Sequence, residues 1–215
     1  MAERGRPRAF DREEALRRAM TVFWARGYEG ASVGDLTEAM GINKPSLYAA
    51  FGCKEDLFRE AIALYDAVES EPIRCALDEE LTARAAVEAV LRHNAQAYPN
   101  PDKPRGCMIV LSSLLGTPES EEVRRFLTET RKAGEDALRQ RVERGIAEGD
   151  VPAGADARKI AAFYTTVIQG LSVQARDGAS TEALNAIVDC AMAAWDTLAG
   201  SCQLPPSCEC IANGG

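Results

Sequence analysis

Apolar residues recur at intervals of three and four along most of the chain, which is the period of amphipathic helices. The first helix is marked by Asp11 and Glu14, spaced as in a capping box, and Gly27 marks its end. No segment has a convincing strand pattern, and no internal repeat is found. The pattern therefore predicts an all-α protein with nine helices, over residues 12–27, 33–40, 44–51, 53–77, 81–98, 105–115, 118–149, 156–177 and 180–200.

Two short predicted helices, 32–40 and 44–51, are joined by a three-residue turn. Gly41 supplies a turn conformation that residues with a Cβ resist, and Ile42 is apolar, as is needed to hold the two helices together. This arrangement is typical of a helix-turn-helix, whose second helix enters the major groove of DNA. An ordinary helical corner has the same spacing, so the spacing alone leaves both interpretations open.

The residues around this turn are suited to contact with DNA. Asn43, Lys44 and Ser46 begin the second helix, where side chains reach base edges, and Tyr48 lies further along the same face. Residues 1–9 read as a flexible basic arm that can cross the DNA backbone or enter the minor groove. These features favour DNA binding over a structural corner. The basic residues of the arm are Arg4, Arg6 and Arg8.

The segment from Phe10 to Ala61 resembles the N-terminal domain of TetR-family transcriptional repressors. The matching run is AMTVFWARGYEGASVGDLTEAMGINKPSLYAAFGCKEDLFREAI. A second stretch, PRGCMIVLSSLLG, resembles the opening of a helix near the effector pocket in one subgroup of that family. The residues that fall at the family's spacings are Phe23, Gly27, Tyr28, Leu36, Gly41, Ser46, Leu47, Tyr48, Phe51, Lys54, Leu57 and Phe58.

The resemblance implies a three-helix DNA-binding domain followed by a six-helix domain for effector binding and dimerisation. The predicted boundaries are 1–9 for the arm, 10–53 for the DNA-binding domain, 54–200 for the second domain and 201–215 for a disordered tail. Lys54, at the start of the fourth helix, is implied to contact phosphate. The other predicted DNA contacts, besides the arm, are Ser32, Asn43, Lys44, Pro45, Ser46 and Tyr48.

Two positions depart from the family pattern. Ala50 stands where many members have a His or Tyr that touches the DNA backbone, so one phosphate contact is in question. Cys53 stands where Ser or Asn often caps the fourth helix, and a thiol is a weaker cap than a hydroxyl.

The last two predicted helices carry broad apolar stripes. Such stripes can line the core of a monomer or pair with a second subunit, and the resemblance implies a four-helix bundle between two subunits. A two-fold operator also calls for a two-fold protein, so we expect a homodimer. The predicted interface residues are Ile160, Tyr164, Ile168, Leu171, Leu184, Ile187 and Ala191.

Charge is distributed unevenly along the chain. The net charge is -8, yet residues 1–60 contain ten Lys/Arg and ten Asp/Glu, so the whole negative excess lies in residues 61–215. An acidic helical body attached to a DNA-binding head indicates a sensor for a small-molecule effector. The pocket candidates, each of which could equally pack in the core, are His93, Tyr98, Cys107, Met108, Phe163, Tyr164, Gln169 and Trp195.

The seven cysteines raise a second possibility. The chain has no apolar leader and no membrane-spanning run, which predicts free thiols in a reducing cytoplasm without membrane partners. Cys107 begins an apolar helix next to Arg105, a setting that favours reactive thiols, although a small buried thiol that only packs is the alternative. The tail residues Cys202, Cys208 and Cys210 could hold a soft metal or have no role.

The predicted function is a homodimeric, sequence-specific repressor that a small-molecule effector releases from double-stranded operator DNA. The alternatives are a repressor that senses oxidants or electrophiles through Cys107 and, more remotely, a thiol enzyme. An enzyme would need a base beside the thiol, and His93 is the single histidine. No Ser-His-Asp arrangement, Gly-rich phosphate loop or zinc-type spacing is found, so neither enzymatic activity nor a cofactor is predicted.

Overall fold

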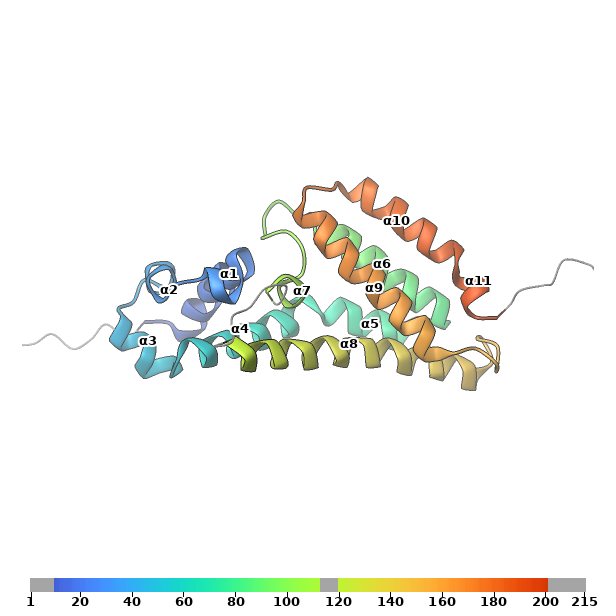
Figure 1. Ribbon diagram of the computed structural model, residues 1–215, viewed down its shortest axis with the longest axis horizontal. Coiled ribbons are helices and arrows are strands. Elements are labelled where there is room, and N and C mark those ends of the chain that lie inside the picture. The colour runs from blue at the N-terminus through green and yellow to red at the C-terminus, as the bar shows by residue number, and fades with distance from the viewer. Residues whose placement is uncertain (1–9, 113–119, 201–215) are drawn as a thin grey trace, which may run out of the picture.

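The computed structural model describes residues 10–112 and 120–200, and within these ranges it contains helices and no strand. The predicted all-α class is confirmed, with a helix-turn-helix head followed by a larger helical body (Figure 1). The basic arm and the cysteine-containing tail lie outside the described residues. The helices are α1 (Arg12–Gly30), α2 (Val33–Met40), α3 (Lys44–Phe51), α4 (Lys54–Glu69), α5 (Glu71–Glu79), α6 (Ala83–Ala97), α7 (Met108–Leu111), α8 (Glu121–Glu148), α9 (Ala157–Arg176), α10 (Thr181–Ala193) and α11 (Trp195–Leu198).

Several predicted helix boundaries are wrong. The helix expected over 53–77 is divided into α4 and α5 at Ser70. Pro72 lies in the first turn of α5, where its missing N–H is harmless, whereas in an uninterrupted helix its ring would clash with the carbonyl of Val68. The last predicted helix breaks at Ala194, between α10 and α11. The helix expected from residue 105 begins only at Met108, after the cap residue Cys107.

α1 continues past its predicted end. Gly27 has φ 71° and ψ 176°, a conformation that residues with a Cβ rarely adopt, and helical backbone resumes after it as far as Gly30. Gly27 therefore ends the first regular helical segment, as predicted, and a kink separates that segment from the short helical turn that completes α1. The following residue, Ala31, is fully buried.

The head is built around aromatic residues of α1 and α4. Phe23 packs edge-to-face on Phe58, with ring centroids 5.0 Å apart, and Tyr28 lies 5.1 Å from Phe58. Leu36 of α2 and Leu47 of α3 are fully buried in the same cluster. This packing holds α3 against the rest of the head and so determines which of its side chains face outward.

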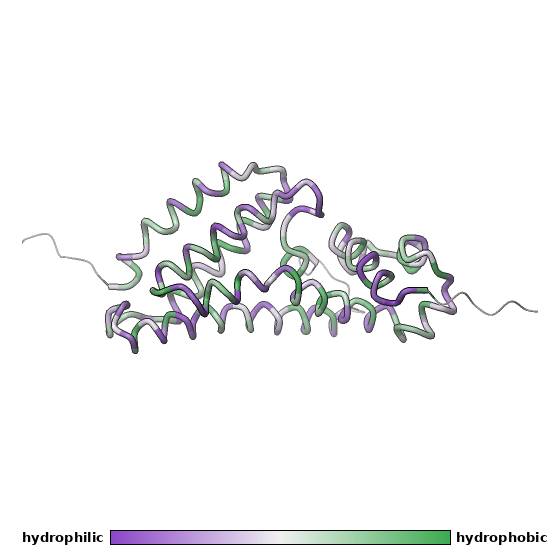
Figure 2. Tube along the Cα trace, turned by 180° about the vertical axis from the view of Figure 1, so that it is seen from behind, coloured by the Kyte–Doolittle hydropathy of each residue, from purple (hydrophilic) through white to green (hydrophobic). Residues whose placement is uncertain are grey.

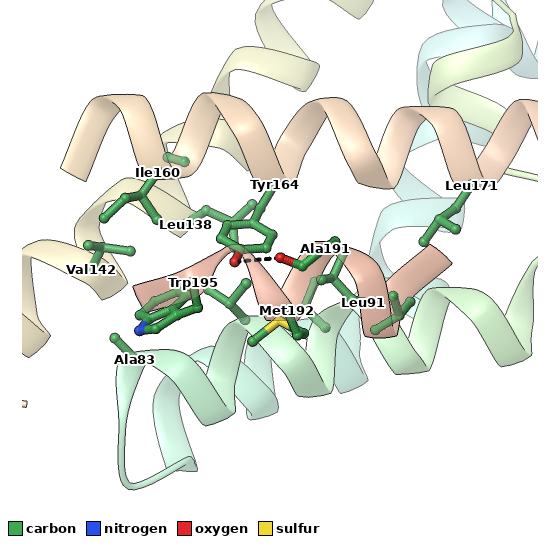
Figure 3. Packing of buried hydrophobic residues seen from close by; sticks show 14 of the residues in the cluster. Ala83, Leu91, Leu138, Val142, Ile160, Tyr164, Leu171, Ala191, Met192 and Trp195 are labelled. Carbon is green, nitrogen blue, oxygen red and sulfur yellow. Dashed lines mark hydrogen bonds between the residues drawn. The ribbon is translucent and has the colours of Figure 1, made fainter. Parts of the chain in front are cut away.

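The body consists chiefly of α6, α8, α9 and α10, and α8 runs along the long axis of the molecule beneath the body, with its N-terminal end reaching the head (Figure 1). Hydrophobic and hydrophilic residues are interspersed along these helices, as expected where each helix buries one face (Figure 2). In the core, the hydroxyl of Tyr164 donates to the carbonyl oxygen of Ala191 at 3.1 Å (Figure 3). Burial raises the pKa of Tyr164 to about 12, so the hydroxyl remains a donor at neutral pH.

Head and body are joined by contacts between α1 and the segment that precedes α7. The buried Trp24 Nε1 donates to the carbonyl oxygen of Gly106 at 2.8 Å, and the Trp24 ring packs edge-to-face on Tyr65 of α4. At the end of α9, Arg176 donates to the carbonyl oxygen of Ala25. A displacement of residues 105–108 or of α9 would therefore act directly on α1.

Candidate DNA-binding surface and ligand cavity

The turn between α2 and α3 has the backbone geometry that the sequence predicts. Gly41 has φ 68°, in the left-handed region, and its N–H donates to the carbonyl oxygen of Glu38 at 3.1 Å. The N–H of Ile42 donates to the carbonyl oxygen of Thr37, also at 3.1 Å. These bonds end α2 and turn the chain directly into α3.

The N-terminal end of α3 presents polar and basic groups to solvent. Asn43 is the N-cap residue, and its Oδ1 accepts from the N–H of Ser46 at 2.9 Å. The cap uses one acceptor site of Oδ1, so the Nδ2 of exposed Asn43 and the second lone pair of Oδ1 remain for a base. Lys44 and Pro45 are exposed, and Tyr48 is 49% exposed. The exposed amide, ammonium and phenol groups at this end of α3 can thus donate hydrogen bonds to acceptors on a partner.

Ser32 caps α2 and shares its hydrogen bonds with Asp35. Its hydroxyl accepts from the N–H of Asp35 at 3.1 Å and donates to the Asp35 carboxylate at 2.6 Å, while Arg26 lies 2.6 Å from the other carboxylate oxygen. The hydrogen bond from the Ser32 hydroxyl has the largest effect, and together with the other bonds it lowers the pKa of Asp35 to about 2. The hydroxyl hydrogen and the backbone N–H of Ser32 are both already donated to Asp35. A DNA phosphate only accepts hydrogen bonds, so Ser32 would have to give up one of these bonds to contact it, which weakens its case as a contact.

The C-terminal end of α3 is held by Arg12, a residue that the sequence analysis did not single out. Its guanidinium bonds both carboxylate oxygens of Glu60, at 2.7 and 2.8 Å, and donates to the carbonyl oxygen of Ala50. It also lies over the Phe51 ring, 4.3 Å from the centroid. Arg12 therefore ties α1, α3 and α4 together. The only sequence signal was a basic residue 48 positions before an acidic one, a separation that carries no local information.

Lys54 lies at the start of α4 with its ammonium group 4.3 Å from the centroid of the Tyr28 ring. Burial lowers the pKa of Lys54, and the nearby carboxylate of Glu29 opposes this effect. The cap beside it is complete, because Cys53 Sγ accepts from the N–H of Asp56 at 3.4 Å and the N–H of Cys53 donates to the Asp56 carboxylate. Cys53 therefore does cap α4, and Tyr28 limits the positions that the Lys54 side chain can reach.

The body contains a partly open cavity of about 360 Å³ between α4, α5, α6, α7, α8 and α9. Among the predicted pocket residues, Tyr98, Cys107 and Gln169 line it. His93 lines a smaller adjoining space of about 50 Å³, together with Tyr98 and Cys107. The other predicted residues do not line the cavity: Met108, Tyr164 and Trp195 are buried in the core, and Phe163 is 36% exposed on the outside of α9.

Cys107 lies where the cavity meets the link between head and body. Its N–H donates to the hydroxyl of Ser172 at 2.8 Å, and its thiol lies close enough to Tyr65 and Tyr98 to affect the pKa of both phenols. Burial, with Cys107 as a further cause, raises the pKa of both tyrosines well above the usual value, so both phenols keep their protons. Cys107 is half-buried and lies beside two phenols.

Most residues of the predicted dimer interface are core residues of the monomer. Their side chains are buried between α6, α9 and α10, because the broad stripes on α9 and α10 face the centre of the body (Figure 3). Ile168 lines the cavity instead, and only Ile187 is exposed, at 39%. The outward faces of the two helices carry other small and apolar residues, namely Ala162, Phe163, Gly170, Ala183, Ala186 and Cys190. The buried predicted residues are Ile160, Tyr164, Leu171, Leu184 and Ala191.

The described ranges, 10–112 and 120–200, contain neither a cluster of metal ligands nor a membrane-spanning helix. There, no three His, Cys, Asp or Glu side chains gather closely enough to hold a metal ion. No helix in these ranges combines the length and apolarity needed to cross a bilayer. The four described cysteines, Cys53, Cys75, Cys107 and Cys190, are not in disulfides.

Two family models match the chain. Residues 15–61 match the model described as bacterial regulatory proteins, tetR family, and residues 83–195 match the model of the tetracyclin repressor-like C-terminal domain. The HTH-type transcriptional repressor ComR of Escherichia coli is 35% identical over 91% of this chain and 93% of its own length. The repressor BdcR of the same organism is 31% identical over 84% and 86%, respectively.

A solved structure extends these matches. A cysteine-substituted variant of the TetR family transcriptional regulator CifR, complexed with 26-bp double-strand operator DNA, is 52% identical to this chain. The similarity covers 89% of this chain and 100% of that chain, with a TM-score of 0.86. The backbone arrangement described above is therefore close to that of a protein bound to its operator.

Proposed function

This chain belongs to the TetR family of bacterial regulatory proteins and is a DNA-binding regulator of transcription, and from that premise we propose that it is a homodimeric repressor released from its operator by a small molecule. The observation that carries the proposal is the bond between Trp24 and Gly106, because it joins α1 of the head to the residue next to Cys107 at the cavity wall. A ligand in the cavity can thus bias the position of the head.

Operator binding is assigned to the exposed end of α3. Lys44 and the Nδ2 of Asn43 reach base edges in the major groove, while Tyr48 and Lys54 meet the backbone. The bonds of Arg12 to Ala50 and Glu60 support this assignment, since they join the C-terminal end of α3 to α4. The arm before Phe10 adds basic residues in the sequence that can lower the dissociation constant through phosphate contacts.

Dimerisation is assigned to the outward faces of α9 and α10. Phe163 and Ile187 are large apolar side chains that the monomer leaves partly exposed, and small residues beside them allow a second pair of helices to approach closely. Two heads would then be held at one spacing, and a ligand that prefers another spacing would weaken DNA binding by its differential affinity for the two states.

The test is a gel shift on the DNA immediately upstream of the protein's own gene, at fixed salt and under reducing conditions. We expect a retarded band with two subunits per operator, and its loss when a small molecule that binds the free protein is added. A band that persists at saturating concentrations of such a molecule would contradict ligand-controlled release.

A second function, thiol sensing, is favoured by the surroundings of Cys107. Its sulfur lies at the cavity wall with two phenols beside it. An alkyl group there would displace Gly106, whose carbonyl oxygen accepts from Trp24. N-ethylmaleimide should then abolish the retarded band for the native protein but not for Cys107→Ser. Cys53 lies next to the DNA-facing Lys54, and Cys190 lies on the proposed dimer face, so alkylation of either can also abolish the band. The experiment is therefore done in a Cys53→Ser, Cys190→Ser background, with Cys75→Ser, at an exposed position of α5, as the matched control.

A further inference from the structure

The cavity of the body contains polar atoms that the protein itself leaves unpaired. Asn94 of α6 is 2% exposed and lines the cavity, and its Nδ2 has no hydrogen-bond partner. Thr165 of α9 is 9% exposed, lines the same cavity, and its Oγ1 also has no partner. Buried groups of this kind destabilise a folded chain unless something pairs with them, so their presence on a cavity wall indicates a polar group of a ligand.

The remaining wall is mostly apolar and has no net charge. Two acidic residues, Asp66 and Glu135, are balanced by Arg74 and Arg131. Arg74 already lies 3.5 Å from Asp66, and Arg131 donates to the hydroxyl of Thr128 at 3.0 Å. The wall therefore offers an anionic ligand as much negative as positive charge, with no net charge to compensate for removing the anion from water. The main apolar residues of the wall are Ile73, Leu77, Val90, Val110, Leu138 and Ile168.

We propose that the cavity binds an uncharged, largely apolar molecule of about two rings, with one oxygen that accepts a hydrogen bond from Asn94 Nδ2 and with Thr165 Oγ1 as a second polar anchor. The volume of about 360 Å³ is more than twice the roughly 150 Å³ of an engineered cavity that holds one benzene. It also falls within the range of small-molecule sites, roughly 300–1,000 Å³. The proposal rests on the proposed function, in which this cavity is the ligand site.

The test uses three probes of similar shape: 2-acetylnaphthalene, which has a carbonyl oxygen, 2-isopropylnaphthalene, which has none, and the anion 2-naphthoate. Their dissociation constants are measured calorimetrically with the full chain. For the native protein, the ketone should bind at least about tenfold more tightly than naphthoate, because a mostly apolar wall without net charge does not repay the loss of the anion's hydration. Tighter binding of naphthoate, or no binding of any probe up to its solubility limit, would overturn the proposal.

Substitutions identify the atoms involved. Asn94→Leu keeps the side-chain size but removes the amide, and it should raise the ratio of the ketone Kd to the hydrocarbon Kd about 5- to 10-fold. Thr165→Val should raise the same ratio less, and it replaces Asn94→Leu as the test if circular dichroism shows that Asn94→Leu does not fold. Thr130→Val is the matched control, because Thr130 also lines the cavity but its hydroxyl already donates to the Phe126 carbonyl oxygen at 2.9 Å.

The control should leave the ratio unchanged. A ratio that also stays constant in Asn94→Leu and Thr165→Val would overturn the assignment of the polar anchors. The gel shift with the same ketone is a separate readout. If the ketone binds with the expected preference and leaves the retarded band in place, ligand-controlled release is wrong while the ligand class stands.

Discussion

The head, residues 10–61, and the body, residues 83–200, differ in how fully their buried polar groups are paired. Among the described residues, every side chain with a buried polar atom lacking a hydrogen-bond partner belongs to the body: Asn94, Ser112, Arg141 and Thr165. In the head, polar groups at helix ends pair within capping boxes or in the clamp of Arg12. A surface that must match DNA benefits from one fixed shape, whereas a ligand site must leave hydrogen-bonding groups unpaired so that the ligand can pair with them.

The two regions also expose apolar side chains differently. The largest exposed apolar side chain of the head is Tyr48, which also carries a hydroxyl and lies on the side of α3. The body exposes Phe163 and Ile187, which have no polar atoms, on the outward faces of α9 and α10. The head is thus suited to a polar partner and the body to a second apolar surface.

The largest expected effect tests the apolar surface of the body. The double substitution Phe163→Glu with Ile187→Glu should convert the dimer to a monomer, because four carboxylates would be buried at the proposed interface. Operator affinity should then fall toward the non-specific level, by roughly 10³-fold or more. Light scattering after size exclusion gives the subunit number, and fluorescence anisotropy on operator DNA gives the affinity.

Two controls separate the interface from the core. Val68→Glu places a charge at an exposed apolar position of α4 and should leave the dimer intact. Leu184→Ala removes a fully buried side chain of α10 and should lower the free energy of unfolding by about 2–5 kcal/mol without changing the subunit number of the folded protein. A dimer that survives the double substitution would place the interface elsewhere.

The next effect tests the fixed polar surface of the head. Lys44→Ala should weaken operator binding by about 1–3 kcal/mol and relax specificity, since Lys44 is exposed at the first position of α3. Anisotropy titrations on operator and on scrambled DNA at one salt concentration measure both changes. Lys132→Ala, at an exposed position of α8, is the matched control and should bind like the native protein. Equal losses on the two DNAs would assign Lys44 to phosphate instead.

A smaller effect tests the connection between the two regions. Trp24→Phe removes the donor to Gly106 while keeping an aromatic ring against Tyr65. Operator affinity without ligand should change little, and the ligand-induced loss of affinity should shrink by about 1 kcal/mol. Titrations of operator with and without a releasing ligand give this difference. An undiminished ligand response would mean that the two regions communicate by another route, such as Arg176 and Ala25.

The smallest effect concerns pH. Because the folded-state pKa of Asp35 is lowered to about 2, its carboxylate stabilises the fold above the ordinary pKa of 3.8, and this contribution is lost as the pH falls from about 4 to about 2. Asp35→Asn lacks the charge throughout. Thermal unfolding between pH 5 and pH 2 should therefore show a smaller fall in Tm for Asp35→Asn than for the native protein. Equal falls would remove Asp35 from the acid response.

The helix-turn-helix could be predicted closely because its signals are local. Gly41 has the positive φ that its position in the turn predicts, and Ser32 and Asp35, three positions apart, form a capping box. Each of these interactions joins residues only a few positions apart. The similarity of residues 10–61 to a known family depends on the same short spacings. By contrast, the bond of Arg12 to Glu60 joins residues 48 positions apart, and no pattern in the sequence predicts it.

The role of each apolar residue in the body was decided by the tertiary structure alone. Phe163 and Tyr164 are neighbours in one stripe, yet Tyr164 is fully buried and Phe163 is 36% exposed. Asn94 gave a weak signal as a polar residue between apolar positions of α6, but its unpaired Nδ2 depends on where α9 lies. Helical periodicity specifies that a face is buried without specifying against what, because burial is non-directional and depends on surfaces that the chain brings together only when folded.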